Sequence, residues 1–450
     1  MRTSAFIALN RVLHEGAYPD LALDGIIRKK PKLSPRDIAL LAEIVYGTVR
    51  WLRKLDYVIG LFAHKGVKKK EVLNILRMGV YQLLFLEGVT GYAAINETVD
   101  IAKSLYGDRL GNFTNAVLRE VSRNKDKIHY PLREKGPITY LEINYSFPRW
   151  LIEKWHSEYG FDYTEKLCNS LNRISPLTMR VNPLKTTRED LIRGLKGRGM
   201  EIIPTPHSPS GITFLTRLDP SQLPEFRSGL FTVQDEGAQL ISYLLDPKPG
   251  EIILDACSAP GGKTTHIAEL MRNEGTIIAL DINDSRLKLV QRQARNLGIN
   301  IVRTVNADAA NRNYEQEYDK ILVDAPCSGL GTIRRNPDAK WKKDLNSILE
   351  LSEIQFKILT AVSRRLKPGG ILVYAVCTLI PEENERVCER FLSQCPEFKL
   401  DTEIEVPFEK GAFFNESSFF LTDPVKHNMD GFFAGRFKKL PVARGQLSVA

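Results

Sequence analysis

The chain has 450 residues, of which 43% are hydrophobic and 26% are charged, and Lys and Arg outnumber Asp and Glu by nine. This composition excludes a disordered chain and a collagen, and the apolar runs fall short of the ~20 residues that a membrane span needs. The apolar run from Ala5 to Leu9 ends at Asn10 and Arg11, too early for a signal peptide. Six cysteines are too few for a disulfide framework, so we expect a cytoplasmic protein.

The positive charge is concentrated in the N-terminal third. Residues 1–135 contain 23 basic and 14 acidic side chains, whereas residues 136–450 contain 40 of each. This asymmetry favours a module that binds a polyanion next to a neutral catalytic body, and a solubilising surface is the alternative. Two basic clusters stand out, namely Arg28, Lys29, Lys30 and Lys32, and Lys65, Lys68, Lys69 and Lys70.

Residues 1–123 show the apolar periodicity of helices. The apolar residues of 113–121, for example, fall on one face of a helix. Alternating period-2 stretches are missing, so we expect an all-α domain over residues 1–135. The polar composition that follows predicts a linker near residues 125–140.

Residues 136–235 combine strand and helix patterns. The expected strands lie at 177–181, 201–203, 211–215 and 230–233, and the expected helices at 187–198 and 220–226. This order is that of a small split βαβ, or RRM-like, α+β domain. An RNA-recognition sheet carries stacking aromatic residues on its central strands, and that pattern is missing here. We therefore expect a spacer or positioning domain.

Residues 236–450 alternate between strands and helices. The expected strands lie at 252–255, 276–281, 301–305, 320–324 and 370–377. One expected helix ends at 270, and two others cover 285–297 and 345–366. This pattern predicts a Rossmann-like, doubly wound parallel sheet. Ligands bind such sheets at the carboxyl ends of the strands.

The turn after the first strand of this sheet reads Asp255-Ala256-Cys257-Ser258-Ala259-Pro260-Gly261-Gly262-Lys263-Thr264. Its small residues let the backbone approach a ligand, and the helix that follows offers free N–H groups. Gly-Lys-Thr also occurs in phosphate-binding P-loops, but that motif needs Gly where Cys257 stands, and Pro260 removes an N–H. S-adenosylmethionine, which has no phosphate, fits better.

Three further carboxylates follow neighbouring strands. Asp281 ends the second strand and would hold a ribose, Asp308 follows the third and would lie near an adenine, and Asp324 ends the fourth. One such residue alone is equally consistent with a helix cap. Together with the Gly-rich turn, the three predict a cofactor site for S-adenosylmethionine.

Two cysteines follow the fourth and fifth strands and are expected to be neighbours. Cysteines are usually buried and inert, which suits the other four but not Cys327 and Cys377 at strand ends. A zinc site would need two more Cys or His at ligand spacing, and a disulfide is not expected in the cytoplasm. A thiolate, however, can add to carbon 6 of cytosine so that carbon 5 accepts a methyl group. Lys263 and Asp324 are the candidates to favour the thiolate and to assist proton transfer; spacing does not choose the attacking cysteine.

These motifs resemble the Sun/NOL1/NOP2 family of RNA cytosine-5 methyltransferases along the whole chain. The turn at 255–264 is similar to the family's cofactor motif. Its two-cysteine signature is similar to Asp-Ala-Pro-Cys-Ser-Gly at 324–329 together with the strand end at Cys377. A C-terminal strand motif of the family is similar to Asp-Gly-Phe-Phe at 430–433. The basic helical domain resembles the NusB-like RNA-binding module of bacterial 16S rRNA methyltransferases. The family usually has Ser or Thr directly before its nucleophile, where this chain has Val376.

The resemblance implies a function and a set of site residues. It implies methylation of carbon 5 of a cytidine in 16S rRNA, with Cys377 as the nucleophile and Cys327 assisting release of the product. DNA cytosine methyltransferases would instead use the cysteine at Cys327. The implied cofactor-binding residues are Cys257, Ser258, Ala259, Pro260, Gly261, Gly262, Lys263, Asp281, Arg286, Asp308 and Asp324. We expect a monomer without metal or membrane; the alternatives are methylation of tRNA or another RNA, and a non-catalytic RNA-binding assembly factor.

Overall fold

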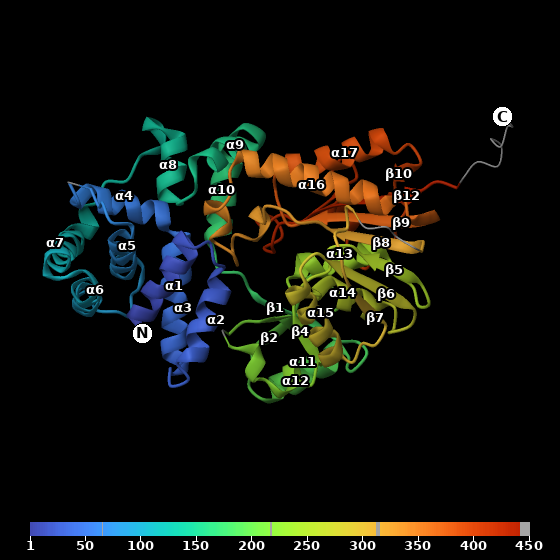
Figure 1. Ribbon diagram of the computed structural model, residues 1–450, viewed down its shortest axis with the longest axis horizontal. Helices are drawn as coiled ribbons and strands as arrows, with labels where there is room; N and C mark the ends of the chain where they lie inside the picture. The colour runs from blue at the N-terminus through green and yellow to red at the C-terminus, as the bar shows by residue number, and fades with distance from the viewer. Residues whose placement is uncertain (65, 217, 312–315, 442–450) are drawn as a thin grey trace. The chain divides into compact units, whose positions relative to one another are not determined.

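The computed structural model describes residues 1–450 except 65, 217, 312–315 and 442–450. The chain forms two compact units (Figure 1). The first, called here the helical unit, consists of Met1–Arg173 and Ile333–Asp344. The second, the sheet unit, consists of Ile174–Thr332 and Leu345–Ala450. The segment 333–344 therefore belongs to the helical unit although it interrupts the sheet unit in sequence.

Among the described residues, the helical unit contains helices and no β-strand, as expected for its N-terminal part. The helices are α1 (Arg2–His14), α2 (Pro19–Lys29), α3 (Pro35–Arg50), α4 (Leu52–Phe62), α5 (Lys70–Phe85), α6 (Gly91–Tyr106), α7 (Asp108–Asn124), α8 (Pro137–Asn144), α9 (Arg149–Tyr159) and α10 (Phe161–Asn172). Ser34 and Asp37 form a reciprocal capping box at the start of α3. Apolar faces of the helices bury two adjoining cores.

The prediction of a linker near 125–140 is wrong in part. Two 3-10 turns, η1 (Lys125–Lys127) and η2 (Arg133–Lys135), occupy this stretch, and α8 begins within it. Arg133 stacks on the ring of Phe161 at 3.9 Å and pairs with Asp162 at 2.7 Å. Tertiary contacts of this kind order a segment whose composition is typical of a loop.

The segment 333–344 is held inside the helical unit. Lys340 is fully buried, donates a hydrogen bond to the carbonyl oxygen of Arg50 at 2.9 Å, and lies 3.9 Å from the ring of Phe147. The indole N–H of Trp341 donates to the carbonyl oxygen of Val49 at 2.7 Å. The end of α3 therefore binds a segment that is about 290 residues away in sequence.

The sheet unit begins with a small antiparallel sheet, as predicted for residues 177–233. Its strands are β1 (Leu177–Val181), β2 (Ile202–Pro204), β3 (Gly211–Phe214) and β4 (Phe231–Val233), in the order β2-β3-β1-β4. The helices α11 (Arg188–Gly197) and α12 (Pro224–Arg227) and the turn η3 (Pro220–Gln222) connect them. This is the split βαβ topology. Its core includes Met179, Leu191 and Phe231.

A larger mixed sheet follows, with strand order β10-β12-β9-β8-β5-β6-β7 and β11 paired to β12. The strands β5 (Ile252–Asp255), β6 (Thr276–Asp281), β7 (Val302–Asn306), β8 (Tyr318–Asp324) and β9 (Leu366–Val376) are parallel, whereas β10 (Phe398–Leu400), β11 (Phe420–Leu421) and β12 (Phe433–Lys439) run antiparallel to their neighbours. The Rossmann-like expectation is confirmed, with an antiparallel edge that the sequence pattern did not indicate.

Helices cover both faces of this sheet (Figure 1). One face packs on α16 (Leu345–Ser363) and α17 (Glu385–Gln394), and the other on α13 (Glu236–Leu245), α14 (Gly262–Leu270) and α15 (Asp284–Leu297). Strand residues alternate between the two cores: Leu254 and Tyr374 face one, Ile253 and Val373 the other. The remaining short elements are α18 (Lys410–Phe413), η4 (Leu330–Thr332), η5 (Ala339–Trp341) and η6 (Pro381–Glu383).

No helix within the described parts of the chain combines the length and apolarity needed to cross a membrane. Across those same parts, His, Cys, Asp and Glu side chains form no group of three or more that could hold a metal ion.

Candidate functional site

The carboxyl ends of β5, β6 and β8 form the floor of the site. Strand β5 pairs with β6 on one side and β8 on the other, and the chain order reverses at this point. Such a switch point opens a crevice outside the strand ends. Asp255, Asp281 and Asp324 are the last residues of these three strands.

The turn between β5 and α14 has the close packing that its small residues predict. Gly261 has a φ of 109°, and a Cβ there would lie 3.0 Å from the Cα of Val290 on α15. Thr264 in the first turn of α14 donates a hydrogen bond to Asp255 Oδ2 at 2.6 Å. The N-terminus of α14 therefore lies at the carboxyl end of β5.

Two buried polar atoms of this turn have no partner among the described residues. They are Asp255 Oδ1 and Ser258 Oγ. Burial raises the pKa of Asp255 to about 7, against the opposing hydrogen bond from Thr264. A buried polar atom without a partner is costly, and these two atoms keep hydrogen-bonding capacity that the described residues do not use.

The carboxylates singled out in the sequence gather around one thiol. Burial raises the pKa of Cys257 well above its usual value, and the charges of Asp255, Asp324, Asp281 and Asp308 raise it further. Asp255, Asp281 and Asp324 are the last residues of β5, β6 and β8, and Asp308 follows β7 by two residues.

Asp281 and Asp308 differ in their local partners. Asp281 accepts hydrogen bonds from the backbone N–H of Ala259 at 3.2 Å and of Asn283 at 2.8 Å, which joins β6 to the turn after β5. Asp308 accepts from the N–H of Ala310 and from the Asn311 amide, so it also stabilises its own turn. The exposed Arg286 donates to the carbonyl oxygen of Ala259 at 2.8 Å and braces the same turn.

Lys263 is a buried cation directed at the end of β8. Its Nζ lies 2.7 Å from Asp324 Oδ2 and 5.1 Å from the ring centre of Phe432. Burial alone would lower the pKa of Lys263, but the charge and hydrogen bond of Asp324, together with the charges of Cys377 and Asp255, raise it. The side chain is therefore an ammonium, and Cys377 is within range of its charge. The sequence singled out Lys263 and Asp324 as candidates to act on the thiolate, but it did not indicate that they pair with each other or that Lys263 lies over Phe432.

Cys327 and Cys377 meet at the ends of β8 and β9. Their sulfur atoms are 3.3 Å apart, a contact between free thiols, and the N–H of Cys377 donates to the Cys327 sulfur at 3.4 Å. The hydrogen bond with Cys377, burial and the charge of Glu383 together raise the pKa of Cys327 well above its usual value. The side chain of Val376 is buried in the hydrophobic core on which Cys327 also packs.

Known proteins show the same three parts in the same order. Residues 1–123 match the NusB family, 147–219 match the ferredoxin-like domain of RsmF/B-like methyltransferases, and 242–438 match the model described as 16S rRNA methyltransferase RsmB/F. The probable ribosomal RNA small subunit methyltransferase B of Bacillus subtilis is 36% identical, with 98% of each chain covered. That of Synechocystis is 36% identical, with 97% of this chain and 99% of its own length covered. The chain belongs to the ribosomal RNA small subunit methyltransferase B family.

Solved structures agree with this membership. The crystal structure of PH0851 is 30% identical, with a TM-score of 0.81 over 97% of this chain and 98% of its own. The structure of NSun6 from Pyrococcus horikoshii with SFG is 25% identical, with a TM-score of 0.60 over 66% of this chain and 99% of its own.

This methyltransferase has a positioning cluster beside its two thiols that the sequence interpretation missed. Glu383, fully buried in the turn after β9, accepts hydrogen bonds from the Ser328 N–H at 2.8 Å, the Ser328 hydroxyl at 2.5 Å, the Thr378 hydroxyl at 3.2 Å and the Gln355 amide at 3.0 Å. Ser328 and Thr378 each follow one of the two cysteines. Burial raises the pKa of Glu383, against these hydrogen bonds.

The Asp-Gly-Phe-Phe motif of the methyltransferase has a packing reason. Gly431 N donates to the carbonyl oxygen of Gly331 at 2.9 Å, and Gly331 N donates to that of Cys377 at 3.0 Å. A Cβ on Gly331 would lie 2.0 Å from the Gly431 oxygen. The start of β12 thus packs directly on the backbone that follows Cys327.

Proposed function

We propose that this methyltransferase transfers a methyl group from S-adenosylmethionine to carbon 5 of a cytidine in 16S rRNA, through a covalent adduct with Cys377. The observation that carries the proposal is the contact of two thiols, 3.3 Å apart, at the edge of the crevice bounded by Asp255, Asp281 and Asp324. Such a pair suits a reaction that needs a nucleophile and a second group for release.

Each site residue has its own role in the proposed methyl transfer. Cys377 forms a bond from sulfur to carbon 6 of the ring, which gives carbon 5 the electron density to bond to a methyl group. The bound donor supplies that methyl on a sulfonium. The donor sulfur leaves as a neutral thioether. A base then takes the proton from carbon 5, the ring double bond re-forms, and the Cys377 sulfur is expelled as a thiolate. Cys327, whose raised pKa keeps it a neutral thiol, is a poor nucleophile and can donate its proton to the departing sulfur 3.3 Å away, which suits the assisting role. Asp324 lies where it can hydrogen-bond the polar edge of the base, and Lys263 holds it there.

The turn after β5 fits the methyl donor. Asp255 Oδ1 and Ser258 Oγ offer unused hydrogen-bonding capacity, and Asp281 retains lone pairs for two ribose hydroxyls. We assign donor binding to Cys257, Ser258, Ala259, Pro260, Gly261, Gly262, Lys263, Asp281, Arg286, Asp308 and Asp324.

The three parts of the chain have separate roles in this proposal. Residues 1–135 bind rRNA, residues 136–235 position the parts of the site, and residues 236–450 hold the methyl donor and the target base. The enzyme works as a cytoplasmic monomer on 16S rRNA, either free or in an early particle. The target base is unpaired or flipped, since a stacked carbon 6 is out of reach of a thiolate.

Tritium transfer from labelled methyl donor to 16S rRNA tests the activity. Cys377→Ala abolishes transfer and forms no adduct. Cys327→Ala accumulates an enzyme–RNA adduct that survives denaturant, because the adduct forms but is not resolved. An adduct with Cys377→Ala instead would reverse the two roles, and label found on a base other than cytosine would overturn the chemistry.

A further inference from the structure

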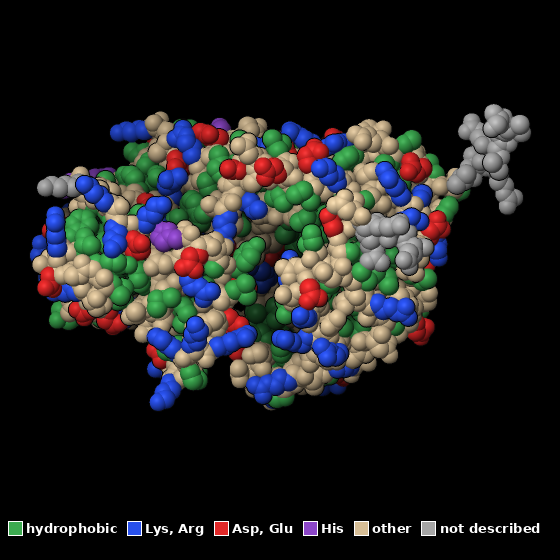
Figure 2. All heavy atoms as spheres, viewed as in Figure 1, with side chains coloured by type: hydrophobic (Ala, Val, Ile, Leu, Met, Phe, Trp, Pro, Cys, Tyr) green, Lys and Arg blue, Asp and Glu red, His purple; other side chains and the backbone are tan. Residues whose placement is uncertain are grey.

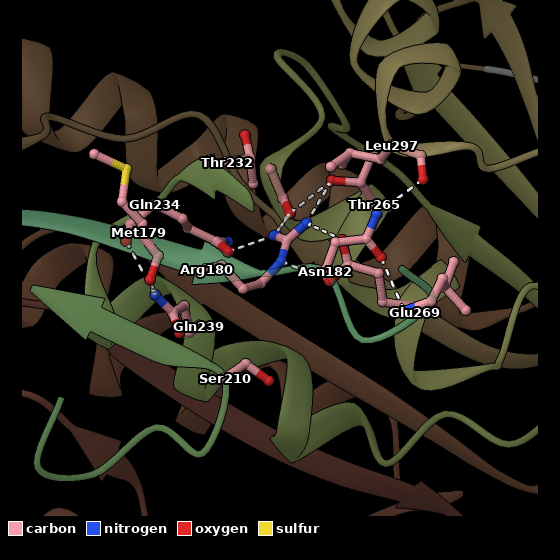
Figure 3. Close-up of polar contacts among 12 residues, drawn as sticks. Met179, Arg180, Asn182, Ser210, Thr232, Gln234, Gln239, Thr265, Glu269 and Leu297 are labelled. Atoms are coloured by element: carbon pink, nitrogen blue, oxygen red, sulfur yellow. Dashed lines mark hydrogen bonds and ion pairs between the residues drawn. The ribbon is translucent and has the colours of Figure 1, made fainter. Parts of the chain in front are cut away.

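Arg180 is a fully buried cation on β1 of the small sheet, and every N–H donor of its guanidinium is used (Figure 3). Its Nε and Nη2 bind the two oxygens of Glu269 at 2.8 and 2.9 Å. Nη1 donates to the carbonyl oxygen of Gly262 at 2.6 Å and to Gln234 Oε1 at 2.5 Å, and Nη2 also donates to Thr265 Oγ1 at 3.0 Å.

Three of these acceptors belong to α14, the helix that opens with the proposed donor-binding turn. Gly262 is the first residue of α14 and the neighbour of Lys263, Thr265 lies in the first turn, and Glu269 lies near the end. Thr264 is bound from the opposite side by Asp255 of β5. The start of α14 is therefore held between a strand of the small sheet and a strand of the large one.

A second side chain of the same segment reaches the next helix. The amide of Asn182 donates to the carbonyl oxygen of Gly229 at 2.9 Å and to that of Leu297, the last residue of α15, at 2.8 Å (Figure 3). Gly261 packs on α15 at Val290. The small sheet thus holds both helices that flank the turn.

The buried Arg180–Glu269 pair adds little net stability to the fold, because both charges lose their hydration. Both side chains are fully buried, and burial raises the pKa of Glu269 in spite of the neighbouring Arg180. A well-packed apolar pair of similar volume often stabilises a core as well as a buried ion pair does. What an apolar pair cannot do is hold the Gly262 carbonyl, the Gln234 amide and the Thr265 hydroxyl in one plane.

We propose that Arg180 is a positioning residue for the methyl-donor site, so that the small sheet sets the affinity for S-adenosylmethionine rather than acting as a spacer. The inference rests on the proposed function, because it takes the ligand of the turn to be S-adenosylmethionine. Arg180 acts through the backbone of α14.

The test is an apolar replacement of the pair in the full-length chain, Arg180→Met with Glu269→Leu, which removes both buried charges. The matched control is Arg436→Met with Asp401→Leu, another buried pair of the sheet unit, whose Nε and Oδ2 are 2.8 Å apart on β12 and after β10. Calorimetry measures the Kd for S-adenosylmethionine, thermal unfolding measures stability, and tritium transfer measures kcat and KM. Arg180→Lys keeps a charge for Glu269 but cannot reproduce the planar fork.

We expect the Arg180/Glu269 double variant to bind S-adenosylmethionine about tenfold more weakly, a loss of about 1.4 kcal/mol, with a raised KM for the donor and kcat within about twofold. The control keeps wild-type affinity whatever its melting temperature. Equal losses in both double variants, or unchanged affinity in the first, would overturn the inference. If the first double variant does not fold, Arg180→Lys decides by the same criterion. A wild-type chain that fails to bind S-adenosylmethionine would instead remove the proposed function and the inference with it.

Discussion

Glu383 joins the two cysteine turns through Ser328, whose backbone N–H and hydroxyl both donate to its carboxylate, at 2.8 and 2.5 Å. Because Ser328 follows Cys327 and the Thr378 hydroxyl also binds Glu383, the carboxylate fixes both turns at once. Glu383 thus fixes the 3.3 Å contact of the two sulfurs through Ser328 and Thr378, a role that requires no contact with the substrate.

Glu383→Ala should leave the buried Ser328 N–H without its acceptor, whereas the Ser328 and Thr378 hydroxyls keep each other at 2.8 Å and the Gln355 amide keeps the Pro326 carbonyl. One unsatisfied buried donor costs about 1–3 kcal/mol, so we expect a loss of about that size in the free energy of unfolding, measured by urea denaturation. Methyl transfer should fall about a hundredfold, since a displacement of about 1 Å in a reacting group has an effect of this size.

Glu383→Gln is the matched control for this prediction. Its amide oxygen still accepts from the Ser328 N–H, and the two hydroxyls can turn to accept from the new NH₂ group. Stability should stay within about 1 kcal/mol of wild type. The negative charge beside Cys327 disappears, so iodoacetamide should modify that thiol faster than in wild type. Equal losses of activity in the Ala and Gln variants would contradict the positioning role.

Asp255 should make stability depend on pH. Its pKa is about 7 in the fold because of burial, against 3.8 for an ordinary Asp, so the fold favours the protonated acid. The stabilisation of the fold by protonated Asp255 is fully present below pH 3.8 and is lost as pH rises towards 7. Above pH 7 Asp255 adds no further pH dependence to the free energy of unfolding. Asp255→Asn, which mimics the neutral acid, should gain stability relative to wild type across this window. At about 1.4 kcal/mol per pKa unit the gain is at most about 4 kcal/mol. A difference that does not change between pH 4 and 7, in urea denaturation without ligand, would refute the assignment.

The alternation of strands and helices in the sheet unit could be predicted because each strand and helix has its own local apolar pattern. Residues 276–281 match β6 to the residue, and 285–297 misses α15 by one. The strand predicted at 370–377 instead begins at Leu366, and the helix before it ends at Ser363 rather than 366. The Pro-Gly pair at 368–369 marks an irregularity in the pairing of β8 with β9, where the register shifts between Tyr318 and Lys320, and not the start of a strand.

The parts that sequence reasoning missed depend on contacts between distant residues. Helices α9 and α10 were not predicted, although the buried Leu151 and Trp155 of α9, and Leu167 and Leu171 of α10, lie four residues apart on one face of each helix. The groups that donate to Glu383 and the groups that accept from Arg180 come from other segments of the chain, so a single sequence offers no pattern for them. The antiparallel strand β12 pairs with β9 across 57 residues of sequence, between Phe433 and Val376, and the chain signals it only through a short motif.

Gly331→Ala should separate the cysteine turn from β12. The new Cβ would lie 2.0 Å from the Gly431 oxygen and 3.0 Å from that of Cys377, so the backbone has to move. We expect a loss of about 1–3 kcal/mol in the free energy of unfolding and a lower yield of covalent adduct in the Cys327→Ala background. Gly411→Ala, in α18 with nothing within 4 Å of its Cβ, should change neither quantity. A Gly331→Ala chain with normal stability and adduct yield would show that this close approach is dispensable.

The basic clusters of the helical unit should determine how RNA affinity depends on salt. Lys29, Lys32, Lys68 and Lys70 are exposed, and Figure 2 shows Lys and Arg side chains spread over the visible face of the molecule. Deleting residues 1–135 is a poor test of their role. The deletion would remove Arg50 and Val49, whose carbonyl oxygens accept hydrogen bonds from Lys340 and Trp341. These two residues follow the Cys327 turn closely in sequence, so the deletion would also disturb the site. Point substitutions avoid this damage.

We therefore predict the effect of Gln at those four lysines together. Each lysine that contacts a phosphate of single-stranded RNA contributes about 0.7 to the slope of log K against log salt, so the slope should fall by up to about 3. Stability and the Kd for the methyl donor should not change, because these side chains are solvated. Lys357→Gln with Lys399→Gln, two exposed positions of the sheet unit, is the control. Filter binding at several salt concentrations measures the slope. A slope that falls by the same amount per lysine in the control would mean that the positive charge acts through the net charge of the chain. An unchanged slope in both variants would mean that other groups contact the phosphates.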